Sequence, residues 1–301
     1  MFQFSYFSTD VCVRVANFAQ FLTSKQYQMS TYNESAKPKV TTASLRKMKA
    51  QGEKIACITS YDYTMASIVD AAGIDFILVG DSAANVMMGY ETTIPITLDD
   101  MITYAKGVVR GARRALVVVD LPFGYYQGCP DIALASAVRI MKETGAGAVK
   151  MEGGSEIRES IERILSAGIP VCGHLGLTPQ SVNKFGGYGV RAKSDAEAEK
   201  LIADAKMLDE MGCFAIVLET IPAPLAAEVT RQVSCPVIGI GAGHEVDGQI
   251  LVVQDMLGMN RGFSPKFMRR YADLADTMQQ ALEHYVADVR SVDFPNDSEQ
   301  Y

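Results

Sequence analysis

The chain has 301 residues and a formal net charge of −7, from 28 Lys and Arg against 35 Asp and Glu. Hydrophobic residues make up 48% and charged residues 21%, proportions that predict a large core and exclude wholesale disorder. The acidic balance argues against a nucleic-acid partner, because phosphate binding needs a basic surface. No apolar run reaches the roughly 18 residues of a membrane span. We therefore expect neither nucleic acid nor a membrane as a partner.

The length fits two ordinary domains or one α/β barrel of about 250 residues. The ends differ from the rest of the chain. Asp10 and Arg14 interrupt any signal-peptide core, and the polar stretch that begins at Met29 resembles an ordinary N-terminus, as an upstream start codon would produce. We expect residues 1–40 to be a poorly ordered extension, residues 41–290 a single catalytic domain with a C-terminal helix, and residues 291–301 a frayed tail.

The cysteines bear on the cellular compartment. They are scattered without a C-x-x-C pair, and several lie inside apolar runs. This usage is typical of reduced core residues rather than of a disulfide framework. We therefore expect a cytoplasmic protein. The six are Cys12, Cys57, Cys129, Cys172, Cys213 and Cys235.

Short runs rich in Val and Ile recur along the rest of the chain. Continuous hydrophobicity of this kind is typical of parallel strands buried on both faces. Amphipathic stretches between the runs predict helices, so the series predicts a (β/α)8 TIM barrel, with an open doubly wound sheet as the alternative. The predicted strands cover residues 55–59, 74–79, 115–121, 148–151, 170–172, 214–218 and 236–240, with residues 249–253 as the candidate eighth.

Polar residues indicate where several helices begin. Thr97 and Asp100 form a capping-box pattern, and Ser155 and Ser194 are candidate N-caps. The Ser-Pro pair at residues 264–265 predicts the start of a long closing helix that runs to about residue 290.

Each predicted strand ends in a polar residue or a glycine just past its apolar run. In a barrel these carboxyl ends converge on one mouth, where active sites lie. A neighbouring loop could provide the hydrogen bonds of any single such residue. Several of them on one rim instead favour a functional site. The residues expected to face the mouth are Asp81, Asp120, Lys150, Glu152, His174 and Glu219.

Two features of this set favour a metal. Lys150 and Glu152 are two apart on a strand and point the same way, and a buried lysine requires carboxylate neighbours. Asp81, Asp120 and Glu152 offer only oxygen ligands, a set that suits Mg²⁺ completed by water and substrate oxygens. Zinc would need more His or Cys ligands. We therefore expect a magnesium site.

Magnesium beside a lysine, a histidine and a further carboxylate suits chemistry next to a carbonyl. A 2-oxo acid can chelate the metal, which then stabilises the enolate formed when a base removes the adjacent proton. Lys150 and His174 are suited to hold the substrate oxygens, and Glu219 is the candidate general acid or base. The residues thus predict metal-assisted carbon–carbon bond formation or cleavage on an oxo acid.

Three alternatives remain open at this point. Lys150 could form a Schiff base, as in class I aldolases, although the carboxylate-rich rim serves a metal better. The barrel could be a magnesium lyase or mutase of the phosphoenolpyruvate group, or a non-catalytic binding subunit. Separately, the glycine-rich stretch at residues 176–189 is a candidate lid.

Several motifs together resemble the ketopantoate hydroxymethyltransferase family. They are VGDS (79–82), DLPF (120–123), VKMEGG (149–154), CGHLGLTPQS (172–181), LE (218–219) and IGIGAG (238–243). The resemblance runs from about residue 40 to residue 290. It implies a barrel of the phosphoenolpyruvate/pyruvate type and a homodecamer. It also implies transfer of a hydroxymethyl group from the co-substrate 5,10-methylenetetrahydrofolate to 3-methyl-2-oxobutanoate, which forms 2-dehydropantoate on the way to pantothenate and coenzyme A.

The resemblance also assigns roles to positions of this chain. By motif match, Asp81 and Asp120 are the direct Mg²⁺ ligands, and both also contact the substrate. Glu152 is the third metal-site carboxylate. The remaining roles fall to Ser82, Lys150 and His174, which hold the oxo acid, and to Glu219, which accepts the proton.

Overall fold

The computed structural model describes residues 38–262 and 265–301. Residues 39–301 form one compact unit, which holds every element named below. The expected extension at residues 1–40 lies almost wholly outside the described residues and stays a prediction. Eight parallel strands close into a barrel in chain order, which confirms the barrel over the doubly wound sheet. The strands are β1 (Ile55–Thr59), β2 (Phe76–Val79), β3 (Leu116–Asp120), β4 (Ala148–Glu152), β5 (Val171–Gly176), β6 (Ala215–Glu219), β7 (Val237–Ile240) and β8 (Gly248–Leu251).

Every predicted apolar run contains or overlaps one of these strands. The largest difference is β5, which continues to Gly176, four residues past the predicted end. Gly173 and His174 break the apolar run, but both pair with β4 and β6 in the barrel. Pairing with the two neighbouring strands therefore extends β5 beyond the end that its apolar composition predicts.

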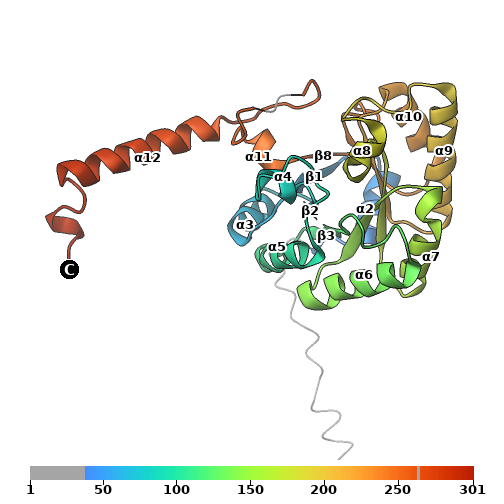
Figure 1. Cartoon of the computed structure of the whole chain (residues 1–301), viewed down its shortest axis with the longest axis horizontal. Helices are drawn as coiled ribbons and strands as arrows, with labels where there is room; N and C mark the ends of the chain where they lie inside the picture. Colours follow the sequence, from blue (N-terminus) through green and yellow to red (C-terminus); the bar gives the residue numbers. More distant parts are fainter. Residues whose placement is uncertain (1–37, 263–264) are drawn as a thin grey trace, which may run out of the picture. The chain divides into compact units, whose positions relative to one another are not determined.

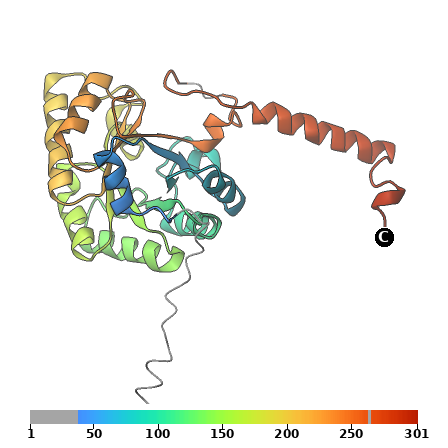
Figure 2. The ribbon, with the colours of Figure 1, turned by 180° about the vertical axis from the view of Figure 1, so that it is seen from behind.

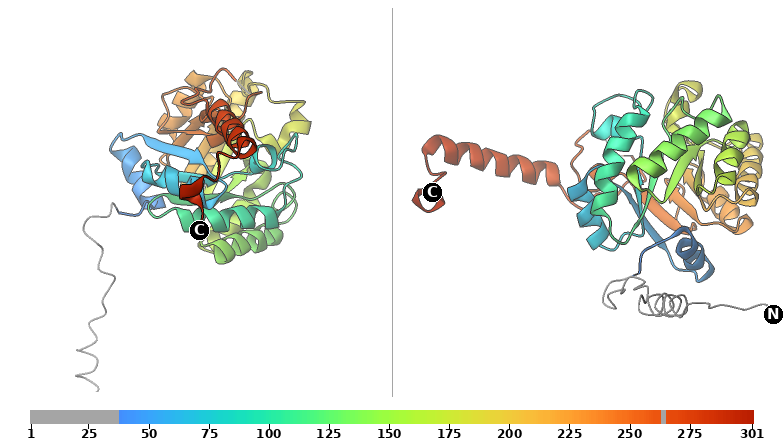
Figure 3. Two further views of the ribbon diagram at one scale, coloured as in Figure 1. Left: turned by 90° about the vertical axis from the view of Figure 1, so that its left-hand side faces the viewer. Right: turned by 90° about the horizontal axis from the view of Figure 1, so that it is seen from below.

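The helices lie outside the strands, as Figures 1 and 3 show. Thr97 and Ser194 cap their helices as predicted. The prediction for Ser155 is wrong, because this residue opens a short 3-10 helix and makes no side-chain cap. The elements are α2 (Thr42–Ala50), α3 (Tyr63–Ala71), α4 (Ala83–Val86), α5 (Leu98–Gly111), α6 (Pro130–Thr144), η1 (Ser155–Ile157), α7 (Arg158–Ser166), η2 (Pro179–Ser181), α8 (Val182–Phe185), α9 (Asp195–Glu210), α10 (Ala223–Gln232), α11 (Val253–Met256), α12 (Leu274–Ser291) and η3 (Asp297–Glu299).

The hydrophobic core has two parts that follow the alternation of the strands. One part fills the barrel interior and includes Phe76 and Leu78 of β2 and Leu116 and Val118 of β3. The other lies between the strands and the helices and includes the intervening residues, such as Ile77. A residue's parity along its strand therefore decides whether it faces the interior.

Helix α2 closes the amino-terminal end of the barrel. Leu45 is fully buried and packs with the interior cluster. Arg46 donates to the carbonyl of Cys213, just before β6, at 3.1 Å. Lys49 forms an ion pair with Asp247, just before β8, at 2.9 Å. Figure 2 shows α2 (blue) lying across this part of the molecule. The open mouth of the barrel is therefore at the opposite end, where the strands have their carboxyl ends.

The last two strands depart from the strand–helix rhythm, because no helix separates β7 from β8. Ala56 of β1 pairs with Gln249 of β8, and both are exposed on the outer face of the barrel. The closing helix also differs from its prediction. It begins at Leu274 after Asp273, whereas Pro265 lies outside any helix, so that prediction of the helix start is wrong.

Helix α12 buries none of its residues, and in the described residues no helix combines the length and apolarity needed to cross a membrane. The five described cysteines carry free thiols. Cys12 lies outside the described residues.

Leu45→Ala tests the role of α2. The substitution removes a fully buried side chain from the base of the interior, so we expect the free energy of unfolding to fall by about 2–5 kcal/mol. Urea denaturation measures the change. Ile132→Ala on α6, where the side chain is 53% exposed, is the control and should stay within about 0.5 kcal/mol of the parent. Equal losses in the two variants would contradict the assignment.

Candidate active site

The predicted site residues form a polar layer above the apolar interior. Along β3 the inward series Leu116, Val118 continues to Asp120, and along β4 the inward residue Ala148 is followed by Lys150 and Glu152. By the same parity, His174 on β5 and Glu219 on β6 face inward. Most are almost completely buried, and Glu219 keeps 17% of its side chain exposed. The barrel thus brings five predicted residues together at one mouth.

Asp81 and Ser82 join this layer from the turn after β2. The main-chain N–H of Asp81 donates to Oδ2 of Asp120 at 3.0 Å, which ties the turn to β3. The hydroxyl of Ser82 lies 2.8 Å from the phenol oxygen of Tyr61, which follows β1. All seven sequence-predicted residues therefore meet, although Ser82 makes its contact with Tyr61 rather than with the carboxylates.

Lys150 is the centre of the polar layer. Its Nζ lies 2.9 Å from Oδ1 of Asp120, 3.7 Å from Oε1 of Glu152 and 3.2 Å from Nδ1 of His174. Burial alone would lower the pKa of the Lys150 ammonium, but the charges of Asp120 and Glu152 outweigh burial and raise it. The lysine is therefore held in its charged form.

His174 lies between two glutamates. Its Nδ1 is 3.3 Å from Oε1 of Glu152, and its Nε2 is 3.3 Å from Oε2 of Glu219. Burial and the charge of Lys150 act to lower the pKa of His174, but Glu152 and Glu219 outweigh them and raise it to about 9. The imidazole is thus favoured in its protonated form near neutral pH and links the lysine cluster to Glu219.

The carboxylates carry more charge than their neighbours balance. Burial, together with nearby carboxylates, raises the pKa of Asp81 and of Asp120. Burial would also raise the pKa of Glu152, but His174 and Lys150 lower it. When all groups are ionised, four carboxylates (with Glu219) against two cations leave a net charge of −2 in a buried site. Such a site favours the binding of a cation.

The oxygen-rich donor set suits Mg²⁺. Within the described part of the chain, Oδ1 of Asp120 is buried without a hydrogen-bond partner, although it lies in ion-pair range of Lys150. No three His, Cys, Asp or Glu side chains of residues 38–262 and 265–301 already stand in a metal-binding arrangement. Mg²⁺ usually takes only one or two carboxylates and keeps several waters, so the residues fit this ion without a complete protein cage.

The sequence patterns did not reveal two residues that contact the acidic residues of the site. Gln180 of η2 and Tyr126 in the loop after β3 are both buried beside the carboxylates. Nε2 of Gln180 donates to Oδ2 of Asp81 at 2.8 Å, and Oε1 of Gln180 accepts from the hydroxyl of Tyr126 at 2.7 Å. Gln180 belongs to the CGHLGLTPQS motif (172–181), and this motif was the one signal available in the sequence. Both side chains are neutral, so a search for charged strand ends passes over them.

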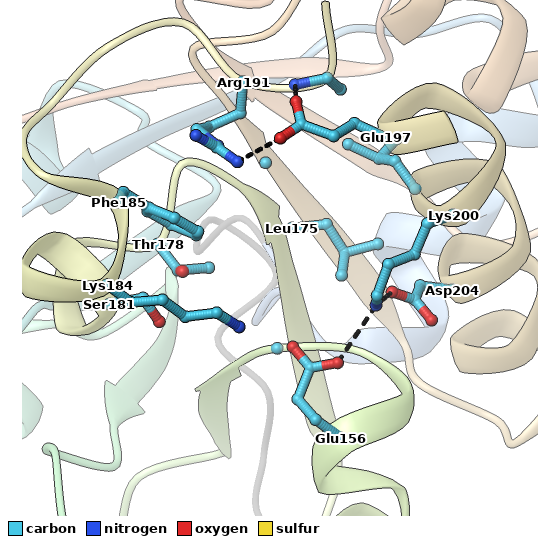
Figure 4. A pocket seen from close by; sticks show the side chains of 14 residues that line it. Glu156, Leu175, Thr178, Ser181, Lys184, Phe185, Arg191, Glu197, Lys200 and Asp204 are labelled. Carbon is cyan, nitrogen blue, oxygen red and sulfur yellow. Dashed lines mark hydrogen bonds and ion pairs between the residues drawn. The ribbon is translucent and has the colours of Figure 1, made fainter. Parts of the chain in front are cut away.

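A separate cavity of about 210 Å³ lies beside the site. Leu175, which faces away from the barrel interior, forms part of its wall, so the cavity is outside the barrel. Figure 4 shows Thr178, Ser181 and Lys184 on one side of it and the ion pair of Lys200 with Glu156 on the other. The predicted lid segment therefore borders this cavity, while its function as a lid stays a prediction.

The fold and the acidic mouth define an enzyme of the (β/α)8-barrel class, and solved structures support the fold. A phosphonopyruvate hydrolase solved in complex with oxalate and Mg²⁺ matches with a TM-score of 0.55 and 10% identity, over 86% of this chain and 93% of that chain. A 2,3-dimethylmalate lyase, described as a member of the PEP mutase/isocitrate lyase superfamily, matches with a TM-score of 0.55 and 18% identity. The match covers 87% of this chain and 92% of that chain.

The family model described as ketopantoate hydroxymethyltransferase matches residues 39–297. A Porphyromonas gingivalis protein and a Bacteroides fragilis protein are each 64% identical to the chain, and one from Flavobacterium johnsoniae is 65% identical. Each alignment covers 273 residues, which is 91% of this chain and 100% of the relative. All three relatives bear the name 3-methyl-2-oxobutanoate hydroxymethyltransferase. The chain therefore belongs to the ketopantoate hydroxymethyltransferase family and is a transferase.

Gly176→Ala tests how β5 and β6 fix the position of Glu219. Gly176 has a φ of +92°, and a Cβ at this position would clash with the carbonyl oxygen of Glu219. We expect backbone strain and the clash to cost more than about 1 kcal/mol of stability, which lowers the Tm by at least about 2 °C.

The matched control is Gly189→Ala, in the same glycine-rich segment. A Cβ on Gly189 would meet no atom within 4 Å, so its Tm should change little. Thermal unfolding of both variants measures the difference, and equal Tm values would show that Gly176 is not needed for this contact.

Proposed function

We propose that the chain transfers a hydroxymethyl group from 5,10-methylenetetrahydrofolate to 3-methyl-2-oxobutanoate and so forms 2-dehydropantoate for pantothenate and coenzyme A biosynthesis. In the overall reaction a carbon–carbon bond forms, water supplies the new hydroxyl oxygen, and tetrahydrofolate leaves. The observation that carries the proposal is that the seven residues assigned by motif match lie together at one barrel mouth. The names of the close relatives support the same acceptor.

The proposed metal is Mg²⁺, held by Asp81 and Asp120 with Glu152 as the third carboxylate. The excess negative charge of the cluster and its oxygen-only carboxylate donors support this choice. When bound, the ion would polarise the keto group of the oxo acid and favour loss of the adjacent proton.

The cationic groups of the chain would orient the substrate. Nζ of Lys150 and Nδ1 of His174 lie 3.2 Å apart, so both side chains border the space where they can hydrogen-bond the carboxylate and keto oxygens of the oxo acid. The Ser82 hydroxyl, which now contacts Tyr61, would donate a further hydrogen bond to a substrate oxygen. Asp81 and Asp120 border the same space and limit how the acid can enter. Together these groups would fix the branched carbon relative to Glu219.

Glu219 is the proposed base. Its carboxylate is the member of the cluster that retains solvent access, and one oxygen lies 3.3 Å from Nε2 of His174. Glu219 would accept the proton from the branched carbon, and His174 would stabilise the negative charge that develops on the keto oxygen of the substrate. This division leaves Asp81, Asp120 and Glu152 free to hold the metal.

A Schiff-base mechanism at Lys150 is the second candidate, and the electrostatics disfavour it. Imine formation needs a neutral amine, whereas Asp120 and Glu152 hold Lys150 in its charged form. Borohydride trapping of a Lys150 adduct would favour the imine. A lyase or mutase reaction, as in the solved relatives of the fold, would be separated by the substrates accepted. A non-catalytic barrel would turn over none of them.

Asp81→Ala and Glu219→Ala should each lower turnover at least about 100-fold while the protein stays folded, because one removes a metal ligand and the other the base. The assay supplies 3-methyl-2-oxobutanoate and 5,10-methylenetetrahydrofolate and follows product formation. EDTA should abolish the parent activity, and added Mg²⁺ should restore it. Glu228→Ala, on the exposed face of α10, is the control with normal rates. Near-normal rates in either site variant would overturn the assignment.

We further propose that the protein works as a homo-oligomer in which a second copy covers exposed apolar surface. Parallel strands are normally covered on both faces, but the outer face at Ala56 and Gln249 is exposed. Helix α12 carries apolar residues at helical spacing that are all at least 41% exposed: Met278, Leu282, Tyr285, Val286 and Val289. Reciprocal covering between copies would bury both surfaces. The decamer implied by the resemblance and the cytoplasmic location both stay predictions.

Leu282→Glu should weaken the assembly, because it places a charge in the centre of the apolar face of α12. The control is Gln280→Glu, which adds the same charge about 200° around the helix. Light scattering after size-exclusion chromatography, at several protein concentrations, gives the mass of each variant. A monomeric parent protein, or an unchanged mass for Leu282→Glu, would contradict this proposal.

A further inference from the structure

Gln180 connects the predicted lid segment to the carboxylates of the site. It lies in η2 and is 4% exposed. Its main-chain N–H donates to Oε2 of Glu152 at 3.0 Å, and its side-chain Nε2 donates to Oδ2 of Asp81 at 2.8 Å. One residue therefore contacts two of the three carboxylates assigned to the metal.

The orientation of the Gln180 amide is fixed by its other partners. Nε2 also donates to the carbonyl of Leu121 at 3.0 Å, while Oε1 accepts from the hydroxyl of Tyr126 at 2.7 Å and from Nε2 of Gln127 at 3.0 Å. A reversed amide would place its oxygen against the Asp81 carboxylate and its NH₂ group against the Gln127 donor. The network thus forces Gln180 to present a donor to Asp81.

Tyr126 completes the link from the loop after β3. Its hydroxyl accepts from the main-chain N–H of Glu152 at 3.0 Å and donates to Gln180. The side chain is 1% exposed, so its position is fixed by packing as well as by hydrogen bonds. The loops after β3 and β5 therefore meet over the end of β4, with Glu152 between them.

The contacts leave one side of Asp81 free. Oδ2 of Asp81 is used by Gln180, and within the described part of the chain Oδ1 of Asp81 makes no hydrogen bond. Glu152 is held in the same way through Oε2, while its Oε1 faces Lys150 and His174. Hydrogen bonds on one oxygen of a carboxylate set the direction of the other.

We propose that Gln180 and Tyr126 are positioning residues that orient Asp81 and Glu152 for a divalent cation. The inference rests on the metal site of the proposed function and adds the groups that hold its ligands in place. Neither residue needs to contact the substrate or the ion. Partners of this kind are typically responsible for a 10–100-fold difference in metal affinity.

The test compares Mg²⁺ binding to the full-length protein, its Gln180→Met variant and its Tyr126→Phe variant. Gln180→Met keeps the length of the side chain but removes its donor and its acceptor, and Tyr126→Phe keeps the ring but removes the hydroxyl. Isothermal titration with Mg²⁺, in the absence of both substrates, should give dissociation constants about 10–100-fold above the parent value. In the transferase assay, raising Mg²⁺ should return the rate of each variant towards the parent rate.

Ser160→Ala is the matched control for a merely structural effect. The Ser160 hydroxyl is buried and donates to the main-chain carbonyl of Tyr126 at 2.7 Å, so the variant loses a hydrogen bond at the same residue without touching the phenol. It should lower the Tm and leave Mg²⁺ affinity unchanged. Circular dichroism confirms that each variant is folded.

Parent-like Mg²⁺ affinity in Gln180→Met, or an equal loss of affinity in Ser160→Ala, would overturn the inference. A parent protein that binds Mg²⁺ normally but lacks transferase activity would refute the proposed function alone. A parent protein that binds no Mg²⁺ would refute both.

Discussion

The buried ammonium of Lys150 among carboxylates is the interaction on which the site depends. A lysine in the interior of a barrel is costly unless its charge is balanced, and Asp120 at 2.9 Å with Glu152 at 3.7 Å provides that balance. The dependence is mutual, because without the lysine the carboxylates would repel one another at close range. The remaining negative charge favours the binding of a divalent cation at the mouth. A single cluster of charged side chains thus stabilises the barrel interior and provides the negative charge that a metal ion requires.

Barrel geometry makes this cluster possible. Alternation along the strands places apolar residues such as Val118 and Ala148 in the interior, and two residues further on it places Asp120 and Lys150 in the same column. Helix α2 closes the opposite end, so the polar layer is exposed only at the mouth. Groups carried by paired strands are held rigidly. The orientation of their individual oxygens is then set by loop residues, of which Gln180 makes the most contacts.

The sequence predicted the barrel and the charged site because both depend on local patterns. Continuous apolar runs are typical of buried strands. A polar residue at the carboxyl end of such a strand lies at the mouth of the barrel. Gln180 and Tyr126 could not be found this way. Gln180 contacts Asp81 across 99 residues of sequence, and Tyr126 contacts Glu152 across 26 residues.

The predicted start of the closing helix was wrong for a related reason. A Ser-Pro pair permits a helix, but the helix begins only where Leu274 and Ala275 bond back to the segment after α11.

The exposed outer face at Ala56 and Gln249, where β1 and β8 pair, would connect the proposed assembly with the site. The two strands are paired with each other, and their exposed outer residues lie in register. Tyr61 follows β1 directly, and its hydroxyl lies 2.8 Å from Oγ of Ser82, the residue that the resemblance assigns to the oxo acid. Val253, just past β8, donates its N–H to Oγ1 of Thr59 at the end of β1. Covering this strand pair with a second copy would therefore stabilise the strand end that holds Ser82 in place. Assembly and substrate binding are then expected to weaken together when the apolar face of α12 is disrupted, even though α12 supplies none of the polar groups at the mouth.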